Sequence, residues 1–228
     1  MYSYICAQLD SQDAKSNLSP EGSVLAIFKK SKENVEQEED KLTWQQKLVR
    51  DLSDLPYILA VFLVIYMLVF RVVVVVGPSM YNTLIDGDRL VLLSNVLYTE
   101  PKQGDIIVAS KKSFEDGECI VKRVIATEGQ TVDIDFNAGI VYVDGIAIDE
   151  PYTYTATTLD EGVAFPLVVD EGHVFVMGDN RNSSKDSRNP QIGLIDEREI
   201  LGKAIFLLSP GTNKGTEAPD YDRIGVIG

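Results

Sequence analysis

The chain has 228 residues, of which 45% are hydrophobic and 25% charged, with a formal net charge of −14. These values fit one folded domain with extensions. The acidic balance argues against a nucleic-acid partner, because nucleic acid requires a basic face. Cys6 and Cys119 have neither metal-type spacing nor a disulfide framework, and the single histidine, His173, excludes a multi-histidine metal site. We therefore expect no metal.

A long apolar run lies in the N-terminal quarter of the chain. The segment LPYILAVFLVIYMLVF, residues 55–70, contains no charge, and with its flanking residues it reaches about 20 residues, enough for a transmembrane helix. We predict this helix over 52–71. A cleavable signal peptide fits less well, because roughly fifty residues precede the run and no small-x-small site follows it. A buried core helix is the other alternative, and the lack of a polar stripe argues against it.

The charges beside this segment predict its orientation. Lys41, Lys47 and Arg50 precede it, whereas Arg71 and Arg89 follow it at similar distance. Basic residues favour the cytoplasmic side, so the polar extension over 1–50 is expected inside the cell. The domain over 72–210 would then lie outside, ending in a C-terminal tail over 211–228.

Short apolar runs and turn signals alternate through the outer domain. We predict strands within six segments: 88–98, 104–110, 119–129, 140–148, 172–180 and 203–210. The pair Asp144-Gly145 indicates a tight hairpin inside the fourth segment. Only 196–202, DEREILG, is typical of a helical turn. The pattern predicts a mostly β domain of antiparallel strands with long loops.

A serine follows a broken strand in VVVVVGPSM, residues 72–80. The β-branched run favours a strand, and Gly77 with Pro78 would end it, which leaves Ser79 at a strand end or tight turn. A nucleophilic serine needs a base. His173 and Lys122 are the candidates, and Ser79 could equally be only a turn residue.

Lys122 has an unusual setting for an ammonium group. On a strand its side chain would share a face with Ile120 and Val124. Burial there would lower the lysine pKa and make the amine a working base. The alternative is an edge-strand lysine whose amine lies in solvent.

The segment MGDNRNSSKDSRNPQIG, residues 177–193, is dense in short polar side chains. Its alternating acids and arginines are typical of a salt-bridged loop that supports a site, or of a solvated loop.

Four segments after the apolar run occur in the same order as the conserved boxes of a known protein family. GPSMYNTLIDGDRLVL, PKQGDIIVAS, KRVIATEGQTV and GDNRNSSKDSRNPQIGLI closely resemble the conserved boxes of type I signal peptidases, with a Gram-positive-like pattern. These are bacterial membrane-bound serine proteases that remove signal peptides from exported proteins. The resemblance covers roughly residues 55–208 and implies a mostly β catalytic domain with two antiparallel sheet regions, tethered by one N-terminal transmembrane helix.

The resemblance also implies roles for single residues. Ser79 would be the nucleophile and Lys122 the general base, without a cofactor, and Ser184 rather than Ser183 would orient the amine. The family's supporting ion pairs correspond to Arg123 with Asp179 and to Asp186 with Arg188. His173 would be structural.

The expected substrates are signal-peptide-bearing preproteins at a lipid membrane, cut after an Ala-x-Ala type site. Met80 and Leu84 would line the pocket for the small residue before the cut. The extended peptide would lie between the strand ending at Val76, with Gly77, and the strand containing Ile120 and Val121.

Two positions depart from the family pattern. Asn82 replaces a turn-fixing proline, and Gly77 stands where some members have a serine in the oxyanion hole, which leaves more of that task to the Ser79 N–H.

Two other functions fit parts of the pattern. A membrane-tethered β-rich module could bind peptides without cleaving them, but it would have no reason to keep Ser79, Lys122 and Ser184 together. A self-cleaving repressor-type protease shares the Ser-Lys dyad, but that family normally carries a DNA-binding region.

Overall fold

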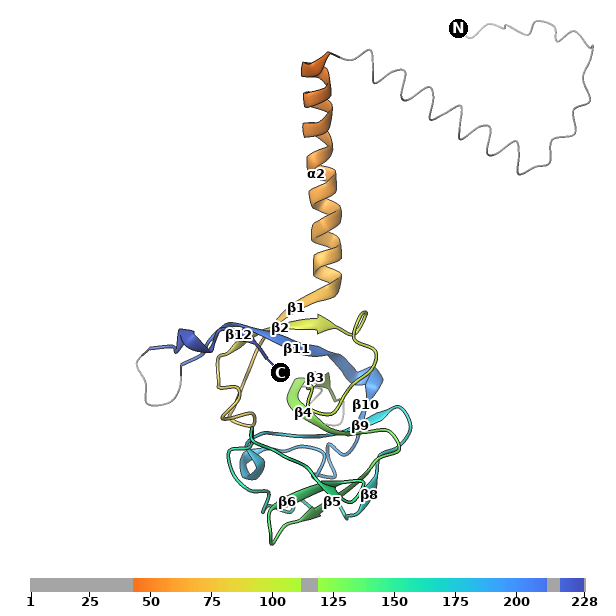
Figure 1. Ribbon diagram of the computed structural model, residues 1–228, viewed down its shortest axis with the longest axis vertical. Helices are drawn as coiled ribbons and strands as arrows, with labels where there is room; N and C mark the ends of the chain where they lie inside the picture. Colours follow the sequence, from red (N-terminus) through yellow and green to blue (C-terminus); the bar gives the residue numbers. More distant parts are fainter. Residues whose placement is uncertain (1–42, 112–118, 213–217, 228) are drawn as a thin grey trace, which may run out of the picture. The chain divides into compact units, whose positions relative to one another are not determined.

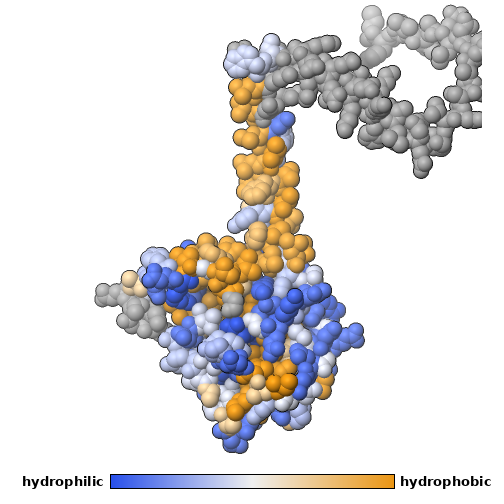
Figure 2. Space-filling model, in the orientation of Figure 1, coloured by the Kyte–Doolittle hydropathy of each residue, from blue (hydrophilic) through white to orange (hydrophobic). Residues whose placement is uncertain are grey.

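The computed structural model describes residues 43–111, 119–212 and 218–227 (Figure 1). The chain divides into two compact units, one up to Val61 and one from Phe62 onwards. The first described element is the helix α2, Trp44–Val69. Its stretch Leu52–Val69 has a mean hydropathy of 2.1 and no buried residue, so it is long and apolar enough to cross a membrane. Figure 2 shows the apolar side chains along it.

The helix differs from the predicted 52–71 at both ends. It begins at Trp44, and it ends at Val69 because Phe70 and Arg71 already belong to the strand β1, Phe70–Val74. These two residues pair with Leu93 and Leu92 of the neighbouring strand. Sheet pairing therefore ends the helix before the apolar run ends.

The larger sheet has eight strands, and all of its pairs are antiparallel. Its order is β1-β2-β11-β3-β4-β9-β10, with β12 also paired to β11. The remaining bounds are β2 Arg89–Ser94, β3 Ile106–Ser110, β4 Cys119–Thr127, β9 His173–Met177, β10 Ile195–Asp196, β11 Ile200–Ser209 and β12 Gly225–Val226.

The smaller sheet has the order β7-β6-β5-β8 and is also antiparallel. Its strands are β5 Thr131–Asp135, β6 Ile140–Val143, β7 Ile146–Ala147 and β8 Leu167–Val168. Asp144 and Gly145 join β6 to β7 with φ angles of 51° and 77°. Both residues are left-handed, as a type I′ hairpin turn requires, so the predicted hairpin is confirmed.

The predicted mostly antiparallel β class is confirmed, and the differences concern its edges. The first strand ends at Val74 rather than Val76. The helical turn predicted in 196–202 is a 3₁₀ turn, η3 Glu197–Glu199, and β11 begins directly after it. The C-terminal tail contains folded elements, the 3₁₀ turn η4 Tyr221–Arg223 and the strand β12.

Three clusters of buried apolar side chains form the core of the second unit, from Phe62 onwards, which contains both sheets and is called the β unit below. The cluster that matters most for the site contains Met80 and Leu84, both 1% exposed, together with residues of β2, β3 and β11. A second lies around Val124 and Val176, and a third joins β5 and β6 to Phe175. Met80, the residue after Ser79, and Val124, two residues after Lys122, are thus anchored in the packed core.

Candidate active site

Ser79 lies in a turn directly after β1. Backbone bonds from Val75 to Asp88 (2.8 Å) and from Gly87 to Val75 (2.9 Å) continue the pairing beyond the strand. Gly77 then adopts φ +85°, and its N–H donates to Asp86 Oδ1 at 2.8 Å. This left-handed backbone conformation is most easily adopted by glycine, so Gly77 and Pro78 turn the chain directly before Ser79.

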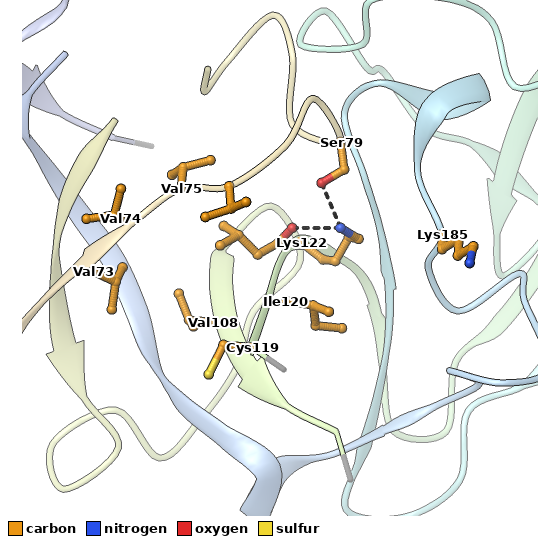
Figure 3. A pocket seen from close by; sticks show the side chains of 11 residues that line it. Val73, Val74, Val75, Ser79, Val108, Cys119, Ile120, Lys122 and Lys185 are labelled. Carbon is orange, nitrogen blue, oxygen red and sulfur yellow. Dashed lines mark hydrogen bonds between the residues drawn. The ribbon is translucent and has the colours of Figure 1, made fainter. Parts of the chain in front are cut away.

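Lys122 lies on β4 and is 5% exposed. Its Nζ is 2.8 Å from Ser79 Oγ and 3.0 Å from the Val121 carbonyl oxygen (Figure 3). Burial lowers the lysine pKa from 10.5 to about 8. A substantial fraction of neutral amine is therefore present near neutral to mildly basic pH, next to the serine hydroxyl.

Nearby charges act on the lysine pKa in both directions. Asp186, Glu161 and Asp179 raise it, and Arg188 lowers it. Desolvation outweighs these carboxylates, because the net direction is downward.

The ion pair of Arg123 and Asp179 ties the serine turn to the sheet. Arg123 Nε and Nη2 donate to the two Asp179 oxygens at 2.8 and 2.7 Å, and both side chains are buried. Thr83 Oγ1 donates to Asp179 Oδ2 at 2.6 Å, and the Asn180 N–H donates to the Ser79 carbonyl at 3.0 Å. The turn is thus held from the loop that follows β9.

The second predicted pair, Asp186 with Arg188, is fully buried and bidentate. Arg188 Nε and Nη2 each lie 2.8 Å from an Asp186 oxygen. Ser184 Oγ donates to Asp186 Oδ2 at 2.9 Å, whereas the amine of Lys122 is bonded to Ser79 and Val121. The structure therefore places Ser184 on Asp186, the carboxylate with the largest charge effect on the lysine.

Gly178 is a residue of the site that our sequence reasoning missed. A Cβ at this position would lie 2.3 Å from Ser184 Oγ and 2.5 Å from the Ser79 carbonyl oxygen. Its N–H donates to Asp186 Oδ2 at 2.9 Å. Only glycine allows this close approach, and its place at the start of GDNR was the available signal.

Glu150 and Glu161 were also missed, because both lie outside the motifs. Glu150 pairs with the fully buried Arg181. Glu161 lies 3.3 Å from Arg188 and is 7% exposed in its side chain.

A cavity of about 510 Å³ borders the dyad (Figure 3). Its walls come from β1 and the residues after it, from β3, from the start of β4 and from the loop after β9: Val73, Val74, Val75, Val76, Ser79, Val108, Cys119, Ile120, Val121, Lys122 and Lys185. Val76, Ile120 and Val121, three of the predicted pocket residues, are among those that line this cavity. β9 pairs with β4 from Arg123 onwards, so within the described strands the edge of Cys119–Lys122 opposite β3 faces this groove.

Three of the predicted pocket residues lie elsewhere. Met80 and Leu84 are core residues and are not among those that line the cavity in the described chain. Gly77 lies in the turn before Ser79 and does not line the cavity. The reason is geometric, because the turn after Pro78 directs Met80 and Leu84 into the core under β2 and β11.

His173 does not contribute to the site as the structure describes it. It begins β9, and its Nδ1 lies 2.8 Å from the Glu171 carbonyl oxygen. The hydrogen-bond partner of the Ser79 hydroxyl is Lys122.

A serine hydroxyl bonded to a buried amine, at the end of an apolar groove with an open strand edge, fits the class of serine endopeptidases. The comparisons with known proteins narrow this class. Residues 49–209 match the sequence model of the family described as signal peptidase, peptidase S26. The chain belongs to this family.

Individual relatives show the same likeness. The chain is 40% identical to the probable signal peptidase I-1 of Synechocystis over 61% of its length and 71% of that protein. It is 34% identical to signal peptidase I S of Bacillus subtilis over 78% of its length and 94% of that protein. A crystal structure of a signal peptidase I from Enterococcus faecalis is 28% identical, with a TM-score of 0.37 over 46% of this chain and 96% of that one.

Proposed function

We propose that this protein cleaves N-terminal signal peptides from exported preproteins after small residues of the Ala-x-Ala type, with Ser79 as nucleophile and Lys122 as general base. The observation that carries the proposal is the 2.8 Å contact between Ser79 Oγ and the amine of Lys122, a lysine that is 5% exposed. A peptide-binding module would gain nothing from burying an amine against a hydroxyl, since burial of a charge is costly.

The groove supports binding of an extended peptide. Main-chain bonds to the open edge of Cys119–Lys122 would supply affinity, and the apolar side chains of Val74, Val76 and Ile120 would accept small apolar side chains. The scissile carbonyl carbon would then lie against Ser79 Oγ.

The reaction follows from the protonation state of the lysine. Neutral Lys122 accepts the proton of Ser79 as Oγ bonds to the carbonyl carbon, and it returns that proton to the leaving amine as the C–N bond breaks. Water then attacks the acyl carbon while Lys122 takes a proton from it, and Lys122 returns this proton to Ser79 Oγ as the ester C–O bond breaks, which releases the signal peptide. The Gly77 N–H is held by Asp86, so the Ser79 N–H is the backbone donor we assign to the oxyanion.

The family and the apolar helix α2 together indicate a membrane-anchored protein. We further propose that the apolar stretch Leu52–Val69 of α2 spans the bacterial cell membrane once, with residues 1–50 in the cytoplasm and the β-sheet domain outside. Support comes from the basic residues that precede this apolar stretch in the sequence, Lys41, Lys47 and Arg50.

Protease added to intact spheroplasts tests this orientation. We expect degradation of the β unit and survival of an N-terminal fragment, detected with tags at either end. Loss of the N-terminal tag alone would contradict the orientation.

Dyad variants test the chemistry, with a preprotein bearing an Ala-x-Ala site and full-length protein in detergent. Ser79→Ala and Lys122→Ala should each lower the cleavage rate by at least about 10³-fold, and the double variant should be no slower, because the two residues act as a unit. Lys122→Arg should be equally inactive, since a guanidinium stays protonated.

Two controls accompany these variants. Lys102→Ala removes an exposed lysine, and His173→Ala removes the single histidine, and both should retain wild-type rates. Cleavage by Lys122→Ala, or loss of cleavage in folded His173→Ala, would contradict the proposed dyad.

A further inference from the structure

The C-terminal segment 218–227 lies outside the stretch that matches the family, which ends at residue 209, yet it is packed into the β unit. Strand β12 pairs with β11 through Val226 with Phe206 and Gly225 with Leu207. Ile227 packs against the core cluster that contains Met80 and Leu84. The segment therefore packs against the same core cluster that holds Met80, the residue after the proposed nucleophile.

Arg223 makes the most specific of these contacts. Its Nη1 and Nη2 donate to the two oxygens of Asp88 at 2.9 and 2.7 Å, and Nη2 also donates to the Thr83 carbonyl at 3.1 Å. Asp88 is fully buried, and it also accepts bonds from the N–H groups of Ile85 and Gly211. One guanidinium thus bridges both ends of the stretch 83–88.

The same stretch is also bonded to the loop that follows β9, which contains Asp179. Thr83 Oγ1 donates to Asp179, whose carboxylate is the partner of Arg123, the neighbour of Lys122 on β4. The turn that contains Ser79 is therefore fastened to the lysine strand through Asp179 and to the C-terminal segment through Arg223.

We propose that Arg223 is a positioning residue for the reaction, and that the C-terminal segment is part of the scaffold that sets Ser79 against Lys122. This inference rests on the proposed roles of Ser79 and Lys122. A displacement on the order of 1 Å between reacting groups can lower a rate about 10²-fold, so a second anchor on the serine turn has a direct effect on catalysis. Residues 83–88 do not line the groove, so substrate binding is not expected to depend on it.

The test compares kcat and KM for the full-length protein in detergent, with a preprotein bearing an Ala-x-Ala site. Arg223→Met should lower kcat about tenfold or more and leave KM unchanged. Arg223→Lys keeps a charge beside Asp88 without the bidentate fork, so it should recover only part of the loss. Arg198→Met is the matched control, because Arg198 is 89% exposed and pairs with Asp196 away from the groove; its kcat should stay at the wild-type value.

A double variant separates positioning from stability. Arg223→Met leaves the Asp88 carboxylate without its cation, which by itself destabilises the fold. Asp88→Asn with Arg223→Met removes that charge, so its melting temperature should recover while kcat remains low. A wild-type kcat in Arg223→Met, or a return of kcat together with the melting temperature in the double variant, would overturn the proposal. Ser79→Ala is assayed in parallel, and cleavage by that variant would refute the nucleophile assignment and not the Arg223 contacts.

Discussion

At the scale of single residues, the site depends on a balance between burial and charge at Lys122. Desolvation lowers the pKa of this lysine to about 8, against the opposing effect of Asp186, Glu161 and Asp179. Because a protonated amine cannot accept the serine proton, kcat/KM should rise as the pH passes through about 8 and fall below it. With the role proposed for Lys122, its burial and the opposing carboxylates together would set the pH at which cleavage begins.

Glu161 offers a direct test of this control. Its Oε1 is buried with no hydrogen-bond partner among the described residues, 3.3 Å from Arg188, and burial followed by Asp186 raises the pKa of its own carboxyl. Glu161→Gln removes a negative charge near the amine, so the Lys122 pKa should fall further. The acidic limb of the kcat/KM profile should therefore move to lower pH.

Two variants check the assignment to charge. Glu161→Asp keeps the carboxylate and should retain the wild-type midpoint, and Glu171→Gln removes an exposed carboxylate and should also leave it in place. A midpoint that stays fixed or rises in Glu161→Gln would show that this carboxylate does not act on the lysine.

At the scale of elements, the site lies where strands end and turns begin. β1 ends before the serine turn, β4 supplies the lysine from an edge that β9 leaves open, and the loop after β9 supplies Asp179, Ser184 and Asp186. The close approach of this loop to the serine turn depends on Gly178, which has room for no side chain.

Gly178→Ala should therefore disrupt both elements. The added methyl group meets Ser184 Oγ and the Ser79 carbonyl, so we expect loss of cleavage and a destabilisation of about 1–3 kcal/mol in urea unfolding. Gly225→Ala is the matched control, because a Cβ there has no atom within 4 Å and its φ is not in the left-handed region. Normal cleavage by Gly178→Ala would mean that the serine turn does not need this contact.

At the scale of the whole molecule, the buried lysine reduces the stability of the fold. Its pKa is about 8 in the folded protein and 10.5 for an ordinary lysine, so the unfolded chain binds more protons between these values. Stability therefore rises with pH across this window. Below pH 8 the folded protein carries the full cost of the buried ammonium, about 3 kcal/mol.

Lys122→Met removes the buried ammonium and should therefore increase the free energy of unfolding. At pH 7 we expect a free energy of unfolding higher than that of the wild type by up to about 3 kcal/mol, with cleavage lost. The difference should shrink as the pH rises from 8 towards 10.5. Urea unfolding in detergent at several pH values measures it, with Lys102→Met as the exposed control, and a gain that is independent of pH would point to packing instead of charge.

Local patterns in the sequence were enough to predict much of this protein. The apolar run, the β-branched strand before Gly77, the Asp144-Gly145 hairpin and the apolar neighbours of Lys122 each depend on residues close together in the chain. The resemblance to signal peptidases then indicated two ion pairs, Arg123 with Asp179 and Asp186 with Arg188, and the structure forms both.

Only the tertiary structure decided the contacts between distant segments. Ser79 and Lys122 are 43 residues apart, and Asp88 and Arg223 are 135 apart, so no local periodicity reports either pair. The same holds for Met80 and Leu84 in the core and for the end of α2 at Val69. Packing and strand pairing set these positions, because they depend on which segments meet when the sheets close, and a single stretch of sequence contains no information about its partner.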